Sequence, residues 1–369
     1  HPGALTWPPS RLTGQASAWR SFDMPWSGRA SEGVLWSATE HAANSSPHPA
    51  PEPAPDASSE NAHRPLIVVL GPTATGKTAL GIALAQRFGG EIVSADSRQI
   101  YRYMDIGTAK PTPEERALVP HHLLDVVNPD QTLTLAEYQS LANDAIHAIH
   151  QRGNLPMLVG GTGQYITALI EGWTAPRVPP NPEFRAELEA FAAEHGNETL
   201  HQRLRQLDPA AAETIDYRNV RRVIRALEVI DATGQPFSEQ RRKNPPPYDV
   251  LQYGLTMDRE RLYARADQRV DEMMAQGFLD EVRRLLDMGY SRHLPAMSGL
   301  GYAQLAAHLL DGVPLDEAVN STKMATHNFI RQQYTWFRGH DNGILWHNSE
   351  SLDISALTED TRRWLEGRD

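Results

Sequence analysis

The chain has 369 residues, 40% of them hydrophobic, which is enough for the core of two domains or of one domain with an insertion. It contains no cysteine, which excludes disulfides, cysteine-ligated zinc and a thiol nucleophile. The formal net charge of −11 argues against indiscriminate nucleic-acid binding, and no apolar run reaches the roughly 20 residues that span a bilayer. These features predict a soluble globular protein.

Residues 1–63 are rich in Pro, Ser, Ala and Gly and show no sustained hydrophobic period. This composition predicts an extended, disordered tail. The tail lacks the apolar stretch of a signal peptide, and we assign it no function.

An apolar run at residues 66–70 leads directly into G-P-T-A-T-G-K-T at residues 71–78, and a helix-like run follows. The spacing G-x-x-x-x-G-K-T between a strand and a helix is that of a P-loop. The glycines let backbone N–H groups surround an anion, Lys77 adds a charge, and the Thr78 hydroxyl is placed to hold Mg²⁺. We therefore predict a phosphate-binding site, although the motif does not identify the phosphate compound.

A second buried strand is predicted at residues 91–95, and it delivers Asp96 and Ser97 at its carboxyl end. Ligands of open α/β sheets bind at that edge. Residues 98–111 form a loop dense in polar and aromatic groups, and loops on a rigid scaffold commonly carry function.

We predict a third strand at residues 120–127, a helix at 135–150 and a further strand at 155–159 that ends in Gly160 and Gly161. Glycines at this point permit close approach of the backbone to a ligand. The adjacent residues His121 and His122 diverge on a strand, which argues against a metal site.

A proline-rich linker begins near residue 176, and residues 172–247 read as a helical insertion. Within it, residues 217–243 contain seven basic and three acidic residues, a net charge of +4. Four arginines fall at i, i+3, i+4 and i+7, on one face of a helix: Arg218, Arg221, Arg222 and Arg225. We interpret this face as a contact with a phosphate backbone, the alternative being an ordinary solvated surface.

The chain then returns to an α/β pattern, with a strand at residues 251–255 and a helix from about residue 259. At roughly 100° per residue, Arg269 falls only about 20° from Leu262 on the apolar stripe of this helix. Arg269 therefore either extends to solvent from the edge of the stripe or meets an anion. Residues 328–338 combine basic, amide and aromatic groups, and their aromatics either stack a base or pack in the core.

Together these segments resemble the tRNA dimethylallyltransferases, which transfer a prenyl group from dimethylallyl diphosphate to N6 of adenosine 37. The resemblance covers about residues 65–347. It is carried by the P-loop and by five further runs: S-A-D-S at 94–97, M-D-I-G-T-A-K-P at 104–111, L-V-G-G-T at 158–162, R-A-L-E at 225–228 and T-W-F-R at 335–338.

The resemblance implies an α/β fold with a P-loop NTPase-like parallel sheet flanked by helices and a mostly helical insertion. It implies a catalytic core at residues 64–171 and 248–348, a tRNA-binding insertion at 172–247 and a C-terminal extension at 349–369.

The resemblance also implies roles for single residues. Asp96 would be the general base, Thr162 would lie near the reacting groups, and Arg269 would hold the diphosphate with the P-loop. The implied diphosphate-binding residues of the P-loop are Gly71, Thr73, Ala74, Thr75, Gly76, Lys77 and Thr78. The implied tRNA contacts are residues 298–302 together with Asp96, Ser97, Arg98, Gln99, Arg185, Arg221, Arg222, Arg225, Arg331 and Arg338.

On this interpretation the cofactor is Mg²⁺, and the partners are dimethylallyl diphosphate and the anticodon stem-loop of tRNA. We expect a cytoplasmic monomer without membrane contact. Three alternatives stay open: a P-loop small-molecule kinase, an adenylate isopentenyltransferase and a non-catalytic RNA-binding module. The strand at 155–159 ends in glycines rather than in a Walker-B-like Asp, which argues against the kinase.

Overall fold

The structure is a computed structural model that describes residues 64–174, 178–240, 242–341 and 343–367, so the predicted tail at residues 1–63 lies outside the described residues. Within these ranges, no helix is both long enough and apolar enough to cross a membrane.

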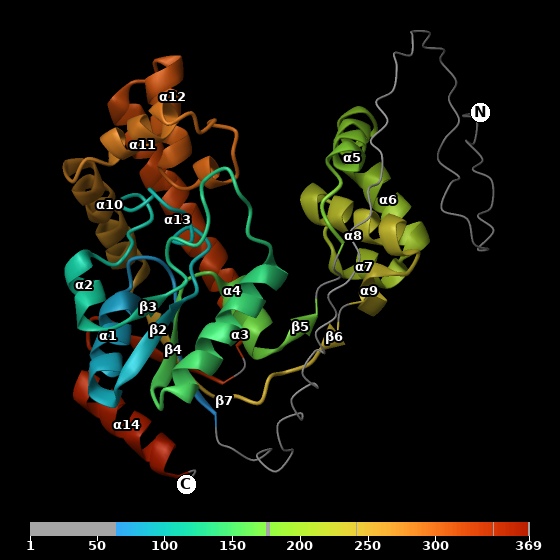
Figure 1. The fold of residues 1–369 in the computed structure, drawn as a ribbon. Helices are drawn as coiled ribbons and strands as arrows, with labels where there is room; N and C mark the ends of the chain where they lie inside the picture. The colour runs from blue at the N-terminus through green and yellow to red at the C-terminus, as the bar shows by residue number, and fades with distance from the viewer. Residues whose placement is uncertain (1–63, 175–177, 241, 342, 368–369) are drawn as a thin grey trace, which may run out of the picture. The chain divides into compact units, whose positions relative to one another are not determined.

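A six-stranded sheet forms the centre of the fold, with the strand order β3-β2-β4-β1-β7-β8 (Figure 1). Every neighbouring pair in this sheet is parallel, which confirms the predicted α/β class. The strands are β1 (Pro65–Leu70), β2 (Gly90–Ser94), β3 (His121–His122), β4 (Leu155–Gly160), β7 (Asp249–Thr256) and β8 (Ile344–Asn348).

The third predicted strand, at residues 120–127, is wrong in length, because only His121 and His122 pair with β2. Leu123 and Asp125 have positive φ values of 63° and 57°, and a residue in the left-handed region cannot continue a strand. Asp125 instead turns toward Lys110 and Arg116, with which it forms ion pairs at 2.6 and 3.1 Å.

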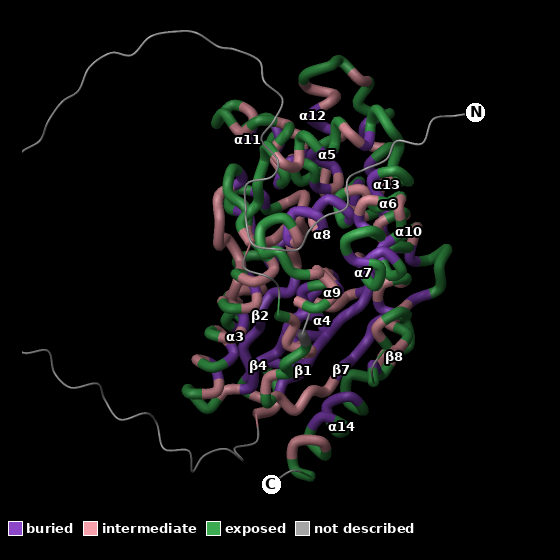
Figure 2. The backbone as a smooth tube through the Cα atoms, turned by 90° about the vertical axis from the view of Figure 1, so that its right-hand side faces the viewer, coloured by how far each residue is buried: buried purple, intermediate pink, exposed green. Residues whose placement is uncertain are grey.

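Successive residues of β1 point to opposite faces of the sheet and join two separate cores. Leu66, Val68 and Leu70 pack with α3 (Leu135–Gln151), α4 (Gly163–Ile170) and α13 (Leu315–Gly339). Ile67 and Val69 pack on the other face with α1 (Lys77–Phe88) and α14 (Ile354–Glu366). The central strands β1, β2 and β4 are therefore buried on both faces, as their purple colouring in Figure 2 shows, whereas the edge strand β8 is partly exposed. The predicted C-terminal extension contains α14, whose Leu357 belongs to this second core.

A helical group lies beyond the carboxyl ends of the strands and comprises α10 (Arg259–Ala275), α11 (Phe278–Asp287), α12 (Tyr302–Asp311) and part of α13 (Figure 1). Its core also includes Ile100 and Met104, which come from the loop after β2. Two short helices, α2 (Pro113–Leu118) and the 3-10 turn at Ala296–Ser298, complete this region. The polar loop noted in the sequence is thus held beneath α11 and α12.

The insertion consists of α5 (Pro182–His195), α6 (Asn197–Leu207), α7 (Pro209–Thr214), α8 (Val220–Thr233) and α9 (Phe237–Gln240). These helices share a core of their own, which includes Leu188, Leu204 and Leu227. The antiparallel pair of β5 (Trp173–Thr174) and β6 (Arg242–Lys243) lies at its two ends.

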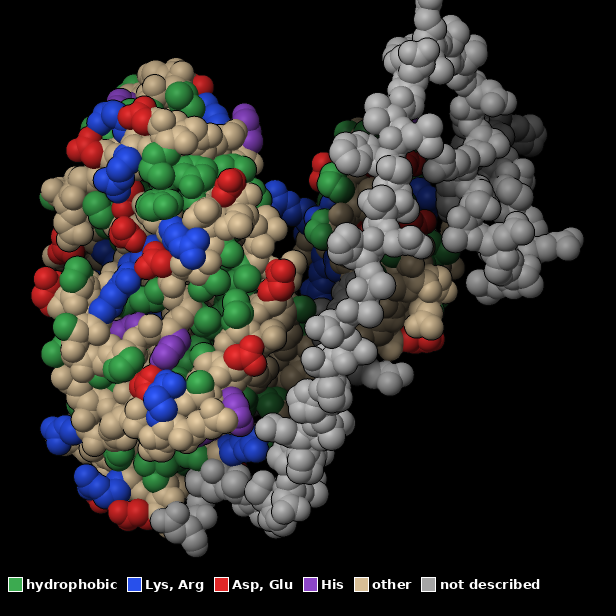
Figure 3. All heavy atoms as spheres, viewed as in Figure 1, with side chains coloured by type: hydrophobic (Ala, Val, Ile, Leu, Met, Phe, Trp, Pro, Cys, Tyr) green, Lys and Arg blue, Asp and Glu red, His purple; other side chains and the backbone are tan. Residues whose placement is uncertain are grey.

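The predicted basic helix of the insertion begins later than the four-arginine pattern requires. Asn219 caps α8, its side chain accepting a hydrogen bond from the Arg222 N–H at 3.3 Å. Arg218 therefore precedes the helix, and only Arg221, Arg222 and Arg225 lie on it. Several Lys and Arg side chains are seen together on the insertion in Figure 3.

Candidate active site

Three segments that follow parallel strands meet at the carboxyl edge of the sheet. The P-loop follows β1, Asp96 follows β2, and the turn with Gly161 and Thr162 follows β4. The Thr162 N–H donates to Ala95 O at 3.1 Å, and its hydroxyl accepts from the Ser97 N–H at 2.9 Å. Thr162 is thus fixed beside the strand end that carries Asp96.

The P-loop has a backbone that requires glycine at both ends. Gly71 and Gly76 have φ values of 141° and 91°, and a Cβ at Gly71 would lie 2.4 Å from Leu255 O. Helix α1 begins at Lys77 and has no acidic residue in its first turn. Its N-terminal N–H groups and their partial positive charge are therefore available to an anion.

Gln333 of α13 connects the P-loop to the β4 turn and is only 6% exposed. Its side-chain oxygen accepts from the Thr73 N–H at 2.9 Å, and its amide nitrogen donates to Gly161 O at 2.8 Å. A Cβ at Gly161 would lie 2.5 Å from that nitrogen, so a larger residue there would displace the Gln333 amide. The amide groups of residues 328–338 are visible in the sequence, but no local pattern there predicts this role for Gln333.

Two cavities lie on either side of the P-loop and share Ala74, Lys77, Thr78 and Arg269. The outer cavity has a volume of about 800 Å³ and is also lined by Arg261 and Arg265 of α10. The inner cavity, which we call the chamber, has a volume of about 110 Å³.

The chamber has a polar side and an apolar side. Lys77, Thr78, Asp96 and Arg269 supply charged and hydroxyl groups. The apolar lining includes four side chains from α10, α11 and the turn before α12: Val270, Met273, Phe278 and Leu300. Such a chamber suits a small apolar group attached to an anion.

The polar side of the chamber holds two cations close to one carboxylate. Burial lowers the pKa of Lys77 to about 7, Asp96 opposes the shift, and Arg269 adds to it. Burial also lowers the pKa of Arg269, again opposed by Asp96 and assisted by Arg265. Arg269 was expected either to extend to solvent or to contact an anion. Its side chain lines the chamber next to the P-loop, which favours contact with an anion.

The residues after Asp96 are held by internal hydrogen bonds. Asp96 Oδ1 accepts from the Arg98 N–H at 2.8 Å, and the Arg98 guanidinium donates to Pro295 O at 2.9 Å. The Gln99 amide nitrogen donates to Thr108 O and Ala109 O at 3.3 and 3.1 Å. That Arg98 and Gln99 contact tRNA stays a prediction, and both also fix neighbouring loops.

Two of the arginines expected at tRNA are bound to one carboxylate inside the insertion. Arg185 donates two hydrogen bonds to Glu228 at 2.8 and 2.7 Å, and Arg225 donates one at 2.6 Å. Burial raises the pKa of Glu228, but Arg185, the Asn181 N–H and Arg225 outweigh it and lower the pKa to about 2. Arg218, Arg221 and Arg222 are exposed.

On α13, Arg331 and Arg338 are exposed, and the Arg338 guanidinium lies 5.7 Å from the centre of the Tyr334 ring. The two aromatics beside them pack inward. Phe337 is 2% exposed in the core, and the Trp336 N–H donates to the Thr167 hydroxyl at 3.1 Å. Core packing, rather than base stacking, therefore accounts for both.

The predicted Mg²⁺ has one candidate protein ligand at the start of α1, the Thr78 hydroxyl. No group of three or more His, Asp or Glu suited to a metal ion occurs in the described part of the chain. Mg²⁺ commonly keeps several waters and binds through substrate phosphates with one or two protein ligands. The donor set at the P-loop fits that mode once a diphosphate is bound.

Comparison with known proteins agrees with this geometry. The family described as IPP transferase matches residues 99–340. A tRNA dimethylallyltransferase of Roseiflexus sp. (strain RS-1) is 55% identical over 82% of this chain and 99% of its own, and one of Roseiflexus castenholzii is 58% identical over 74% and 90%.

Two solved structures are similar as well. A tRNA isopentenylpyrophosphate transferase from Bacillus halodurans has a TM-score of 0.61 and 39% identity, covering 83% of this chain and 96% of its own. A eukaryotic dimethylallyltransferase acting on tRNA has a TM-score of 0.72 and 25% identity, covering 83% of this chain and 80% of its own.

The shifted pKa of Lys77 predicts that proton uptake accompanies binding of a diphosphate. At about pH 8, binding of methyl diphosphate should be accompanied by uptake of about one proton per site. The bound anion raises the pKa of Lys77 from about 7, so the Lys77 amine becomes protonated. For the same reason, affinity should fall as the pH rises above about 7, where the free protein loses this charge. Calorimetric titration in two buffers with different heats of ionisation measures the uptake.

The Lys77→Arg variant is the matched control for this experiment. Its guanidinium stays protonated at every accessible pH, so binding should proceed without proton uptake. Equal uptake by the wild-type and variant proteins would contradict the assignment of the shifted pKa to Lys77.

Proposed function

The chain belongs to the IPP transferase family, and we propose on this premise that it transfers the dimethylallyl group of dimethylallyl diphosphate to N6 of adenosine 37 in tRNA. The products are N6-isopentenyladenosine in the tRNA and free diphosphate. The protein is thus a tRNA-modifying transferase. The observation that carries the proposal is the chamber, in which a P-loop, a carboxylate and an apolar wall meet.

In this reaction the bond between C1 of the dimethylallyl group and the diphosphate oxygen breaks, and its electron pair leaves with the diphosphate. A new bond forms between C1 and adenine N6, which gives up one proton. We infer that Asp96, which follows β2 and lines the chamber, accepts that proton. The Thr162 hydroxyl accepts a hydrogen bond from the N–H of Ser97, the residue after Asp96, and Thr162 therefore lies near Asp96.

The leaving diphosphate must be neutralised as its charge develops. Lys77, Arg269 and the N-terminal N–H groups of α1 provide positive charge on the polar side of the chamber. Thr78 would hold Mg²⁺, which when bound stabilises charge on the phosphate oxygens as a Lewis acid. The apolar lining around Val270 and Met273 accommodates a short isoprenoid chain.

The adenine must leave the stack of the anticodon loop to reach a chamber of this kind. We infer that the exposed arginines Arg218, Arg221 and Arg222 of the insertion bind phosphates of the anticodon arm. Arg185 and Arg225 bind Glu228 inside the insertion, and Arg225 also donates to Val178 O, so we infer that their remaining N–H groups contribute less to tRNA binding than those of the exposed arginines. Arg331 and Arg338 extend the basic surface along α13.

The kinase alternative needs a strand-end carboxylate for its Mg²⁺ besides the P-loop hydroxyl. β4 ends in Gly160 rather than in such a carboxylate, and Asp125 is bound to Lys110 and Arg116, so the kinase alternative would have to use Asp96 for this purpose. The basic insertion argues for a polymer substrate, and so against the adenylate isopentenyltransferase alternative. We further propose that the protein acts as a monomer, because one chain supplies every group named here. We also propose that it acts in the cytoplasm, where its tRNA substrate is found.

The proposal predicts a defined product. Wild-type protein incubated with unmodified tRNA, dimethylallyl diphosphate and Mg²⁺ should release diphosphate and yield prenylated adenosine in digested tRNA, as detected by mass spectrometry. AMP offered in place of tRNA should remain unmodified. Hydrolysis of ATP without any prenylated nucleoside would instead support the kinase.

Binding of tRNA by the insertion predicts a change in salt dependence. Replacing Arg218, Arg221 and Arg222 with Ala should reduce the slope of log K for tRNA against log salt by roughly 2 to 3, at about 0.7–0.9 per phosphate contact. Fluorescence-anisotropy titrations at several salt concentrations measure both slopes. Binding of dimethylallyl diphosphate should not change, because these arginines do not line either cavity.

The control removes the same charge elsewhere. Arg87, Arg362 and Arg363 are exposed on α1 and α14, and their triple Ala variant should keep the wild-type slope. If the insertion variant also keeps that slope, the basic face is an ordinary solvated surface and tRNA binds elsewhere.

A further inference from the structure

A segment without helix or strand forms one wall of the chamber. Residues 104–110 contain the run D-I-G-T-A-K, and Gly107, Thr108 and Ala109 all line the chamber. Ala109 has a φ of 49°, which L-residues adopt only when the surroundings impose it. Something other than secondary structure must hold this wall in place.

Glu281 of α11 provides that hold. Its carboxylate accepts three successive backbone hydrogen bonds, from the N–H groups of Asp105 at 3.0 Å, Ile106 at 2.9 Å and Gly107 at 3.2 Å. The Tyr302 hydroxyl donates a fourth at 2.6 Å. Successive N–H groups of this kind form a concave anion site, and here the anion is a side chain of the same protein that is only 1% exposed.

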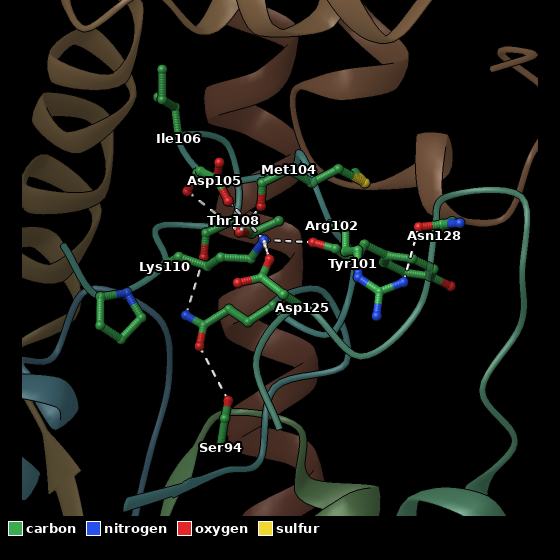
Figure 4. Close-up of polar contacts among 12 residues, drawn as sticks. Ser94, Tyr101, Arg102, Met104, Asp105, Ile106, Thr108, Lys110, Asp125 and Asn128 are labelled. Atoms are coloured by element: carbon green, nitrogen blue, oxygen red, sulfur yellow. Dashed lines mark hydrogen bonds and ion pairs between the residues drawn. The ribbon is translucent and has the colours of Figure 1, made fainter. Parts of the chain in front are cut away.

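Two further side chains, those of Lys110 and Gln99, hold the rest of the segment, and the contacts of Lys110 are seen in Figure 4. Lys110 is buried, and its ammonium donates to Tyr101 O, to Asp105 Oδ1 at 2.7 Å and to Asp125 Oδ1 at 2.6 Å. The Gln99 amide holds Thr108 O and Ala109 O. Of the three polar side chains Glu281, Lys110 and Gln99, Glu281 is the one that belongs to the helical group, so its hydrogen bonds tie the wall to α11.

The contact between the segment and α11 is close. A Cβ at Gly107 would lie 2.2 Å from the Phe278 ring, and Phe278 itself lines the chamber. Phe278 stands one turn before Glu281 on the same helix and packs edge-on against Tyr302, with ring centres 4.9 Å apart. The carboxylate therefore sets the spacing between two chamber walls, one from the segment and one from α11.

We propose that Glu281 is a positioning residue of the transfer reaction: it holds residues 105–107 at the spacing from Phe278 that aligns the isoprenoid chain with the adenine. This inference rests on the proposed function. Glu281 does not itself line the chamber. It acts by keeping the segment still, since misplacement of a reacting group by about 1 Å can cost about 10²-fold in rate.

The test uses two isosteric variants of the full chain. In Glu281→Gln, one acceptor oxygen becomes an NH₂ group, which cannot accept from a backbone N–H. Tyr302→Phe removes only the fourth hydrogen bond and leaves the three backbone bonds in place. Single-turnover rates are measured at saturating tRNA and dimethylallyl diphosphate, and each is normalised to the number of sites that bind methyl diphosphate.

Glu91→Gln is the matched control. Glu91 is likewise buried, and it accepts hydrogen bonds from Arg152 at 2.9 and 2.7 Å and from Asn154 at 2.7 Å. It lies near the beginning of β2, at the opposite edge of the sheet from the chamber. Any loss that comes from disturbing a buried carboxylate in general should appear in this variant too.

We expect Glu281→Gln to lower the normalised rate by about ten- to hundredfold, with a smaller loss in Tyr302→Phe and none in Glu91→Gln. The affinity for methyl diphosphate should remain, because the P-loop is held by other elements. Use of geranyl diphosphate relative to dimethylallyl diphosphate should rise in both chamber variants, since the wall can yield to a longer chain. A purely structural role would not change that ratio.

Normalised rates and ratios equal to those of the control would overturn the inference, as would a loss confined to diphosphate affinity. If Glu281→Gln does not fold, the rate and ratio of Tyr302→Phe decide the question. A wild-type protein that makes no prenylated adenosine would instead overturn the proposed function, so the two failures can be told apart.

Discussion

The parallel strands β1, β2 and β4 end at one edge of the sheet, and the chemistry of the site depends on that alignment. It brings the P-loop, Asp96 and the β4 turn together, although these three segments are separated from one another along the chain. Gln333 then fixes the distance between the P-loop and the β4 turn, because its amide bonds to both backbones. Glycines at positions 71 and 161 permit this approach, since a Cβ at either would collide with a neighbour.

The same alignment forces charges into a partly buried space before any substrate binds. Lys77 and Arg269 both have pKa values lowered by burial, and Asp96 offsets only part of that cost. On the proposed function, a bound diphosphate would supply the missing negative charge, and the same cations would stabilise the charge that develops as the diphosphate leaves. The protein thus holds its cations in the arrangement that the reaction requires, at some expense of stability.

Motifs with local spacing made much of this predictable. The P-loop and the β2 strand end were visible in the sequence because each is a short run with a fixed chemical purpose, and the parallel sheet was implied by the family resemblance. The positions of Lys77, Asp96 and Arg269 around one chamber agree with what the family resemblance implied.

Contacts between distant residues were not predictable in the same way. Gln333 and Glu281 act on backbone groups 260 and about 175 positions away, and neither belongs to a recognisable motif. The periodicity that grouped Arg218 with Arg225 could not show that Asn219 starts the helix or that Glu228 binds Arg225. The strand predicted at residues 120–127 ends at His122 in the structure, because Asp125 turns away to form an ion pair with Lys110.

The assignment of Asp96 as the base for the N6 proton is tested most directly by the single-turnover rate of Asp96→Asn at saturating tRNA and dimethylallyl diphosphate. Asn keeps the shape of the side chain and an acceptor for the Arg98 N–H, but it cannot take up a proton. The rate should fall by about 10²–10⁴ while the affinities for tRNA and diphosphate stay close to those of the wild type. A rate within about twofold of the wild type would contradict the role of Asp96.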